Sequence, residues 1–157
     1  MDSVSVERSI RAEPEALWDL VSDLPAMGQW SPENNGGDWI GGADGPAVGA
    51  KFKGANEHGS HRWSTLSTVS IAERPLEFAW EVTYGPFKVA RWSFRFEPDG
   101  ESTTVTETFT DRRSSFFAWV GSKATGVSDR ASHNREGMER TLEALASTAE
   151  GSGSSDG

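Results

Sequence analysis

The chain has 157 residues and carries 24 acidic against 15 basic side chains, which gives a formal net charge of −9. This charge argues against nucleic acid and an anionic membrane surface as partners, because both attract basic surfaces. The absence of cysteine excludes disulfides, a thiolate nucleophile and a cysteine-based metal site. No segment approaches the roughly 20 apolar residues of a membrane span, and the N-terminus lacks a secretory signal. We therefore expect a cytoplasmic protein with no stable membrane insertion.

The length is typical of one domain with a true hydrophobic core. Seven Trp and eight Phe concentrate the apolar area in a few large side chains. Residues 1–149 are assigned to a single domain. Residues 150–157 are rich in Gly and Ser and are expected to form a disordered tail.

The N-terminal segment predicts a strand followed by a helix. Val4, Val6 and Ile10 alternate with polar residues, as in a half-buried strand. Pro14 suits the first turn of a helix, where its missing N–H is not needed. The apolar stripe of this helix consists of Leu17, Leu20, Val21 and Leu24.

The next segment predicts a second short helix and then a Gly-rich region. The helix begins at Pro25 and ends near Pro32, and residues 34–49 follow with a short strand at Trp39-Ile40. This region is not a phosphate loop, because no Lys-Ser/Thr pair follows the glycines and no strand leads into a helix.

Five alternating segments then follow at hairpin spacing, and short turns connect them. They cover about 50–57, 62–73, 76–84, 88–96 and 102–110. Closing each turn on its nearest residues places Trp80 opposite both Val69 and Trp92, and Trp92 opposite Glu107. One register then gathers the large apolar side chains on a single face. That face holds Phe52, Trp63, Val69, Ile71, Phe78, Trp80, Tyr84, Trp92, Phe94, Val105 and Phe109.

The last predicted element is a long amphipathic helix from Asp129 to Ala149, with Ser128 as its cap. Its apolar stripe consists of Ala131, Asn134, Met138, Thr141, Leu142 and Leu145. The stripe must be buried, and the apolar face of the sheet is the surface that suits it.

The order of these elements resembles the helix-grip fold of the START-related SRPBCC superfamily, and within it the bacterial polyketide cyclase/dehydrase-like proteins. The resemblance covers roughly residues 3–148. It rests on segments 14–23, 30–32, 49–54, 78–80 and 106–112, and on Trp63, Asp129, Arg130, Asn134, Gly137, Met138, Thr141 and Leu142. It implies an α+β fold in which a curved antiparallel sheet of six to seven strands wraps a long C-terminal helix, with two short helices after the first strand.

The resemblance also implies a cavity between sheet and helix that holds an apolar or aromatic, polyketide- or lipid-like molecule. Two alternatives remain open: a polyketide cyclase or dehydratase, and a chaperone-regulator type of protein-binding module. We expect no cofactor, and either a monomer or a weak homodimer. Residues 114–127 are interpreted as a lid or as a dimer contact.

The residues expected to line the cavity are mostly large and inward-facing, and they could equally well fill a solid core. The predicted ligand-binding residues are Phe52, Asn56, Trp63, Trp80, Tyr84, Trp92, Phe94, Phe109, Asn134 and Met138. No metal site is expected, because His58 and His61 lie in a turn far from His133 in the sequence.

Glu107 is the one predicted catalytic residue. Its position between Val105 and Phe109 places a carboxylate on the apolar face, where desolvation would raise its pKa. It is either a polar anchor or general acid/base, or a member of a structural ion pair with Arg112, Arg113 or Arg130.

Overall fold

The computed structural model describes residues 3–27, 36–42, 45–58, 61–111 and 130–154; the side chains of 55–63, 130–134 and 151–154 are outside the description. The strands are β1 (Ser3–Ile10), β2 (Gly37–Ile40), β3 (Lys51–His58), β4 (His61–Glu73), β5 (Glu77–Tyr84), β6 (Phe87–Asp99) and β7 (Ser102–Asp111). The helices are α1 (Pro14–Ser22), α2 (Leu24–Met27) and α4 (Arg130–Ser154).

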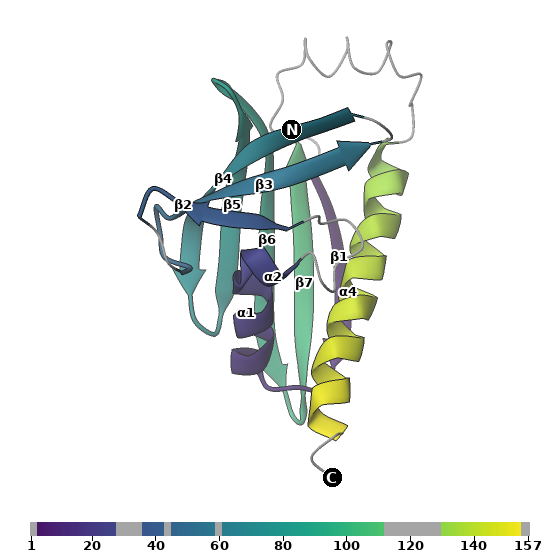
Figure 1. Cartoon of the computed structure of the whole chain (residues 1–157). Coiled ribbons are helices and arrows are strands. Elements are labelled where there is room, and N and C mark those ends of the chain that lie inside the picture. The colour runs from purple at the N-terminus through teal and green to yellow at the C-terminus, as the bar shows by residue number, and fades with distance from the viewer. Residues whose placement is uncertain (1–2, 28–35, 43–44, 59–60, 112–129, 155–157) are drawn as a thin grey trace.

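The strands form one antiparallel sheet in the order β1-β7-β6-β5-β4-β3-β2. The chain therefore runs as a meander from β2 to β7, and β1 then pairs with β7 at the far edge. The sheet curves, and α1, α2 and the long α4 lie against its inner side (Figure 1). This is the predicted arrangement of a curved antiparallel sheet, a long C-terminal helix and two short helices after the first strand.

The predicted register is correct across the middle of the sheet and wrong at β6–β7. Trp80 lies opposite Val69 and Trp92, as expected. Trp92 lies opposite Phe109, however, and Glu107 lies opposite Phe94. The sequence predicts a turn at Pro98-Asp99-Gly100, whereas Pro98 pairs with Thr103 and Asp99 with Ser102, so that the turn is Gly100-Glu101. A shift of two residues keeps every side chain on its expected face, because side chains alternate with period two.

A bulge in β4 changes which side chains face inward. Between Val69 and Ile71 the register shifts by one residue, so that Ala72 rather than Ile71 lies opposite Phe78. Ala72 packs against the core, and the prediction that Ile71 faces inward is wrong. The extra residue of a bulge reverses the facing of the strand beyond it. No local sequence signal marks this position.

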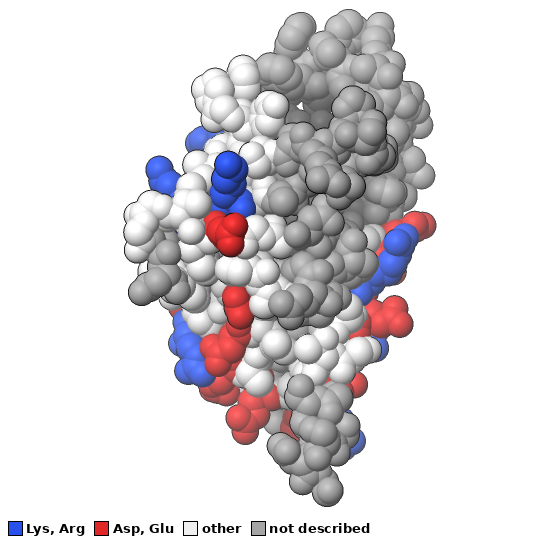
Figure 2. Space-filling model, viewed as in Figure 1, with Lys and Arg blue, Asp and Glu red and all other residues white. Residues whose placement is uncertain are grey.

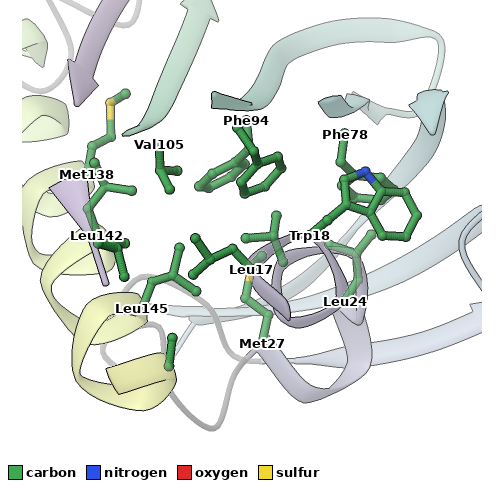
Figure 3. Packing of buried hydrophobic residues seen from close by; sticks show 14 of the residues in the cluster. Leu17, Trp18, Leu24, Met27, Phe78, Phe94, Val105, Met138, Leu142 and Leu145 are labelled. Carbon is green, nitrogen blue, oxygen red and sulfur yellow. The ribbon is translucent and has the colours of Figure 1, made fainter. Parts of the chain in front are cut away.

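The core forms where α1, α4 and the sheet meet. Leu17 of α1, Leu145 of α4 and Val105 of β7 are completely buried, and Figure 3 shows the first two pointing toward each other beneath the sheet. Trp18 was not in the predicted stripe, yet it is buried as well. Its ring packs edge-on against Phe78 with centroids 5.6 Å apart, and its Nε1–H donates to the carbonyl of Glu77 over 2.9 Å. The buried indole thus has its polar atom satisfied.

Helix α4 buries the predicted stripe and extends beyond the predicted end. Met138, Leu142 and Leu145 are buried, together with Gly137, Thr141, Ala146 and Ala149. The helix ends at Ser154 rather than Ala149, so that residues 150–154 of the predicted tail are helical. The Oε2 atom of Glu150 accepts a hydrogen bond of 3.0 Å from the backbone N–H of Arg11. In the described part of the chain no helix is long and apolar enough to cross a membrane.

Of the two glycines that face each other on β2 and β3, Gly37 should lose more stability on substitution by alanine. It pairs with Gly54 across β2–β3, has φ of +151°, and a Cβ there would collide with the Lys53 carbonyl and lie 2.7 Å from the Phe52 ring. A Cβ on Gly54 meets nothing closer than Thr65 Oγ1 at 3.5 Å. We expect Gly37→Ala to cost about 1–3 kcal/mol and Gly54→Ala less than about 1 kcal/mol. Thermal unfolding followed by circular dichroism measures both, and equal losses would contradict the close approach.

The pair Asp19–Arg74 should make stability depend on pH. Arg74 donates to both carboxylate oxygens of Asp19 over 2.9 and 3.1 Å, and these hydrogen bonds, with the positive charge, lower the pKa of Asp19 against a raising effect of burial. The stabilisation is therefore present above the ordinary carboxyl pKa and is lost as pH falls through the lowered value. Both side chains are about half exposed, so the effect is small.

We expect Asp19→Asn to lower the urea midpoint at pH 7 and to match the parent protein in strong acid. Glu97→Gln, at an exposed position on β6, is the control for the loss of one carboxylate and should leave the difference between acid and neutral pH unchanged. If the urea midpoints of the parent protein and Asp19→Asn differ by the same amount at all pH values, the ion pair is not the cause of the difference.

Candidate functional site

The inner face of the sheet consists of rows of side chains that run across the strands. One row joins Val6, Glu107, Phe94 and Phe78 on β1, β7, β6 and β5. Glu107 is 2% exposed, and its neighbours in the row are almost completely buried. The sequence-based expectation that this carboxylate lies on the apolar face is confirmed. Burying a carboxylate costs free energy, and only hydrogen bonds or an ion pair of that carboxylate offset the cost.

The next row toward the start of α4 contains two side chains that are only partly buried. Trp92 and Phe109 lie opposite each other on β6 and β7, and their ring centroids are 4.8 Å apart at an interplanar angle of 52°. Both rings are only partly buried, whereas Phe94 and Val105 in the rows behind them are 1% and 0% exposed. Glu107 therefore lies between a fully packed region and a region where aromatic surface is left accessible.

Trp80 connects these rows to the rest of the inner face. Its ring stacks on Phe94 with centroids 5.9 Å apart at 15°, and it contacts Phe78 at 5.6 Å. Ser67, in the row that also holds Phe52, is 6% exposed. The inner face thus offers mainly aromatic surface, with the Glu107 carboxylate and the Ser67 hydroxyl among its few polar groups, a composition that suits an apolar ligand.

The structure brings together most of the predicted ligand-binding residues for which it describes side chains. Those that face inward and are at least partly buried are Phe52, Trp80, Trp92, Phe94, Phe109 and Met138. Tyr84 does not join them. It lies at the tip of the β5–β6 hairpin opposite Phe87 and is 55% exposed. The prediction that its ring is buried is wrong, because the strand extends beyond the part of the sheet that the helices cover.

Other predictions fall outside the description. Asn56 and Trp63 lie opposite each other in β3–β4, as predicted, and Asn134 lies in α4, but their side chains are not described. The same applies to the proposed partners of Glu107, namely Arg112, Arg113 and Arg130, and to residues 114–127. Among the described residues, no group of three His, Cys, Asp or Glu is placed to hold a metal ion.

Two aromatic residues of the inner face were missed by sequence reasoning. Phe96 is 1% exposed, and its spacing of two from Phe94 was a sufficient signal. Trp39 of β2 packs edge-on against Phe52 with centroids 5.7 Å apart. It stands in a strand of four residues within a Gly-rich region, so its orientation depends on the pairing of β2 with β3.

Comparison with known proteins agrees with this architecture. The family model described as "Polyketide cyclase / dehydrase and lipid transport" matches residues 1–150. A search of curated proteins gave no match.

Solved structures share the fold. A polyketide cyclase-like protein of Corynebacterium glutamicum, Cgl2372, is 29% identical with a TM-score of 0.64, over 95% of this chain and 93% of that one. A START superfamily protein of Mycobacterium smegmatis is 19% identical with a TM-score of 0.71, over 94% of this chain and 97% of that one. The di-domain ARO/CYC protein StfQ of the steffimycin pathway is 12% identical with a TM-score of 0.65, over 94% of this chain and 44% of that one.

The helix-grip fold is therefore shared with START-like proteins, and the chain belongs to the polyketide cyclase/dehydrase and lipid transport family.

Proposed function

We propose that this protein binds an apolar or aromatic small molecule, polyketide- or lipid-like, between the inner face of the sheet and α4. The observation that supports this proposal best is the pair Trp92–Phe109, whose rings remain partly accessible beside a face that is otherwise closely packed. Family membership supports the same class of ligand.

The physical basis is the combination of apolar area with ring geometry. Burying apolar surface contributes about 25 cal/mol per Å², and a well-placed aromatic pair adds about 0.5–1.5 kcal/mol. A planar ligand next to Trp92 and Phe109 would gain both. Native mass spectrometry of freshly purified protein tests the proposal directly, because a tightly held molecule appears as added mass. Quenching of Trp fluorescence by aromatic polyketides and fatty acids is the companion measurement.

Replacing the Trp92 ring should weaken ligand binding more than it weakens the fold. We expect Trp92→Leu to reduce the affinity for the best quenching ligand about tenfold, which corresponds to about 1.4 kcal/mol. Phe87→Leu on the same strand is the control, because Phe87 lies at the hairpin tip and is 50% exposed. If Trp92→Leu and Phe87→Leu bind the ligand with equal affinity, Trp92 is not part of the binding site. Absence of binding by any apolar ligand, in folded protein, would contradict the proposed function itself.

A second function is favoured by one observation, the buried carboxylate of Glu107 next to this aromatic surface. We propose as the alternative a polyketide cyclase or dehydratase in which Glu107 is the general acid/base. In such a reaction the carboxylate accepts a proton from the carbon between two ketones, and the enolate adds to a further carbonyl carbon of the chain, which closes the ring. The new alkoxide takes the proton back from Glu107, and loss of the hydroxyl with a second proton from the same carbon releases water. No second acid/base group is identified among the described residues of the inner face.

The variant Glu107→Gln separates the roles of Glu107, because it keeps the shape and removes the charge. If Glu107 contacts ligand, we expect at least a tenfold loss of affinity or turnover with an almost unchanged melting temperature. If Glu107 belongs to a structural ion pair, stability should fall by about 3–5 kcal/mol. Glu97→Gln, at an exposed position on β6, is the control for the substitution itself. Mass spectrometry of poly-ketone chain mimics, searched for loss of one water, distinguishes an enzyme from a binding protein.

A further inference from the structure

A groove separates β1 from α4 on the outside of the molecule, at the edge of the sheet. It has a volume of about 500 Å³ and is lined by Ser5, Val6, Glu7 and Arg8 of β1 and by Arg135, Glu139, Leu142 and Glu143 of α4. We call it the β1–α4 groove. Val6 and Leu142 are 7% and 2% exposed and form its floor, whereas its charged residues are exposed.

One wall of the β1–α4 groove is a strand edge with its backbone groups turned outward. In the sheet order of the described residues, β1 is the last strand. The carbonyl of Ser5 accepts a hydrogen bond of 3.4 Å from Nη1 of Arg135 on α4, so it points away from β7. The short contact of 2.9 Å between Ser5 Oγ and Thr108 Oγ1 agrees with this, because side chains lie closer in pairs that exchange no backbone bonds.

The alternation of an antiparallel strand extends this result along β1. The N–H and C=O of one residue point to the same side, and successive residues point to opposite sides. The backbone groups of Ser5 and Glu7 therefore face the β1–α4 groove. From Ser5 to Arg8 the strand rises about 10 Å over three steps, and from Arg135 to Glu143 the helix rises about 12 Å over eight steps. The two walls match each other and the length of about four extended residues.

The charged residues of α4, which forms the other wall, indicate which peptide segment the groove would bind. Glu139 and Glu143 are four residues apart on α4 and line the groove on the same side of the helix. Arg135 already donates to the backbone of Ser5. With Glu7 the groove carries three carboxylates against two guanidinium groups. Figure 2 shows acidic and basic residues along this side of the molecule.

We propose that the β1–α4 groove binds an extended, basic peptide segment of a partner protein, which adds as a strand to the edge of β1. The backbone of the segment pairs with Glu7 and takes the place of Arg135 at the Ser5 carbonyl, and its Lys or Arg side chains reach Glu139 and Glu143. Strand addition beside a helix is a common mode of peptide recognition. Val6 and Leu142 at the floor of the groove belong to the core, but the residues that would contact the peptide are exposed and are not those of the Trp92–Phe109 pair, so this proposal does not depend on the small-molecule site.

The test uses fluorescence anisotropy of a labelled, terminally blocked hexapeptide of alternating Lys and Val. We expect saturable binding to the full chain, at least tenfold weaker binding of the Glu-Val analogue, and loss of binding when alternate residues are N-methylated on the pairing edge. Binding of the Lys-Val and Glu-Val peptides with equal affinity, or no binding of the Lys-Val peptide at 1 mM protein, overturns the proposal.

Two kinds of variant locate the interaction. Glu7→Pro removes an outward N–H and leaves the β1–β7 bonds intact, so it should reduce affinity at least tenfold relative to Glu7→Ala. The double change Glu139→Lys and Glu143→Lys leaves the backbone unaltered and should have a similar effect. Glu136→Lys is its control, because Glu136 pairs with Arg140 at 3.7 Å and does not line the groove.

The α4 variants keep the test valid if Glu7→Pro fails to fold. Unchanged affinity in the double α4 variant overturns the proposal. So does a dimer in analytical ultracentrifugation that Glu7→Pro dissociates, because a second copy of the chain would then occupy the β1 edge. Small-molecule binding measured in the same variants should be unchanged, so that failure of this proposal and failure of the proposed function are distinguishable.

Discussion

The structure depends on the burial of one helical stripe against one curved face. Met138, Leu142 and Leu145 of α4 need an apolar surface, and the inner face of the sheet supplies it. Helix α1 completes the contact, since Leu17 and Trp18 close the end of the sheet that α4 does not fill. Three elements far apart in the sequence thus share one core, as Figure 3 shows. Apolar burial of this kind is the main favourable contribution to folding.

The same arrangement divides the inner face into two regions. Where α1 and α4 both approach the sheet, the side chains pack completely, as for Phe94 and Val105. Toward the start of α4 the rings of Trp92 and Phe109 stay partly accessible. Glu107 lies at the boundary, where a carboxylate meets aromatic surface. A binding function requires such a boundary, because a fully packed core leaves no surface for a ligand.

The outer edge of the molecule has a different character. The stripe that α4 buries is narrow, so its charged residues Glu139 and Glu143 remain exposed beside β1. An edge strand presents backbone groups that seek partners, and proteins commonly protect such edges with charge or a covering element. Here the helix stands next to the edge and reaches its backbone through the hydrogen bond from Arg135 to the Ser5 carbonyl, and a groove with one backbone wall and one acidic wall remains between them.

Local patterns in the sequence determined the number, order and facing of the main elements. Alternation with period two predicts the faces of β3 to β7, and spacing of three and four predicts the stripe of α4. Parity alone placed Glu107 on the apolar face, and this was correct even though its predicted partner, Trp92, was wrong by two residues. A register error of two residues leaves each side chain on its predicted face, because side chains alternate along a strand with period two.

Only the tertiary structure decided the details that break the alternation. The bulge after Val69 replaces Ile71 with Ala72 on the inner face, and the turn at Gly100-Glu101 moves Glu107 next to Phe94. The exposure of Tyr84 depends on how far the hairpin extends beyond the covering helices. Each of these results depends on contacts between strands or layers, and a pattern within one strand cannot specify them. The β1–α4 groove arises in the same way, because it joins residues about 130 positions apart.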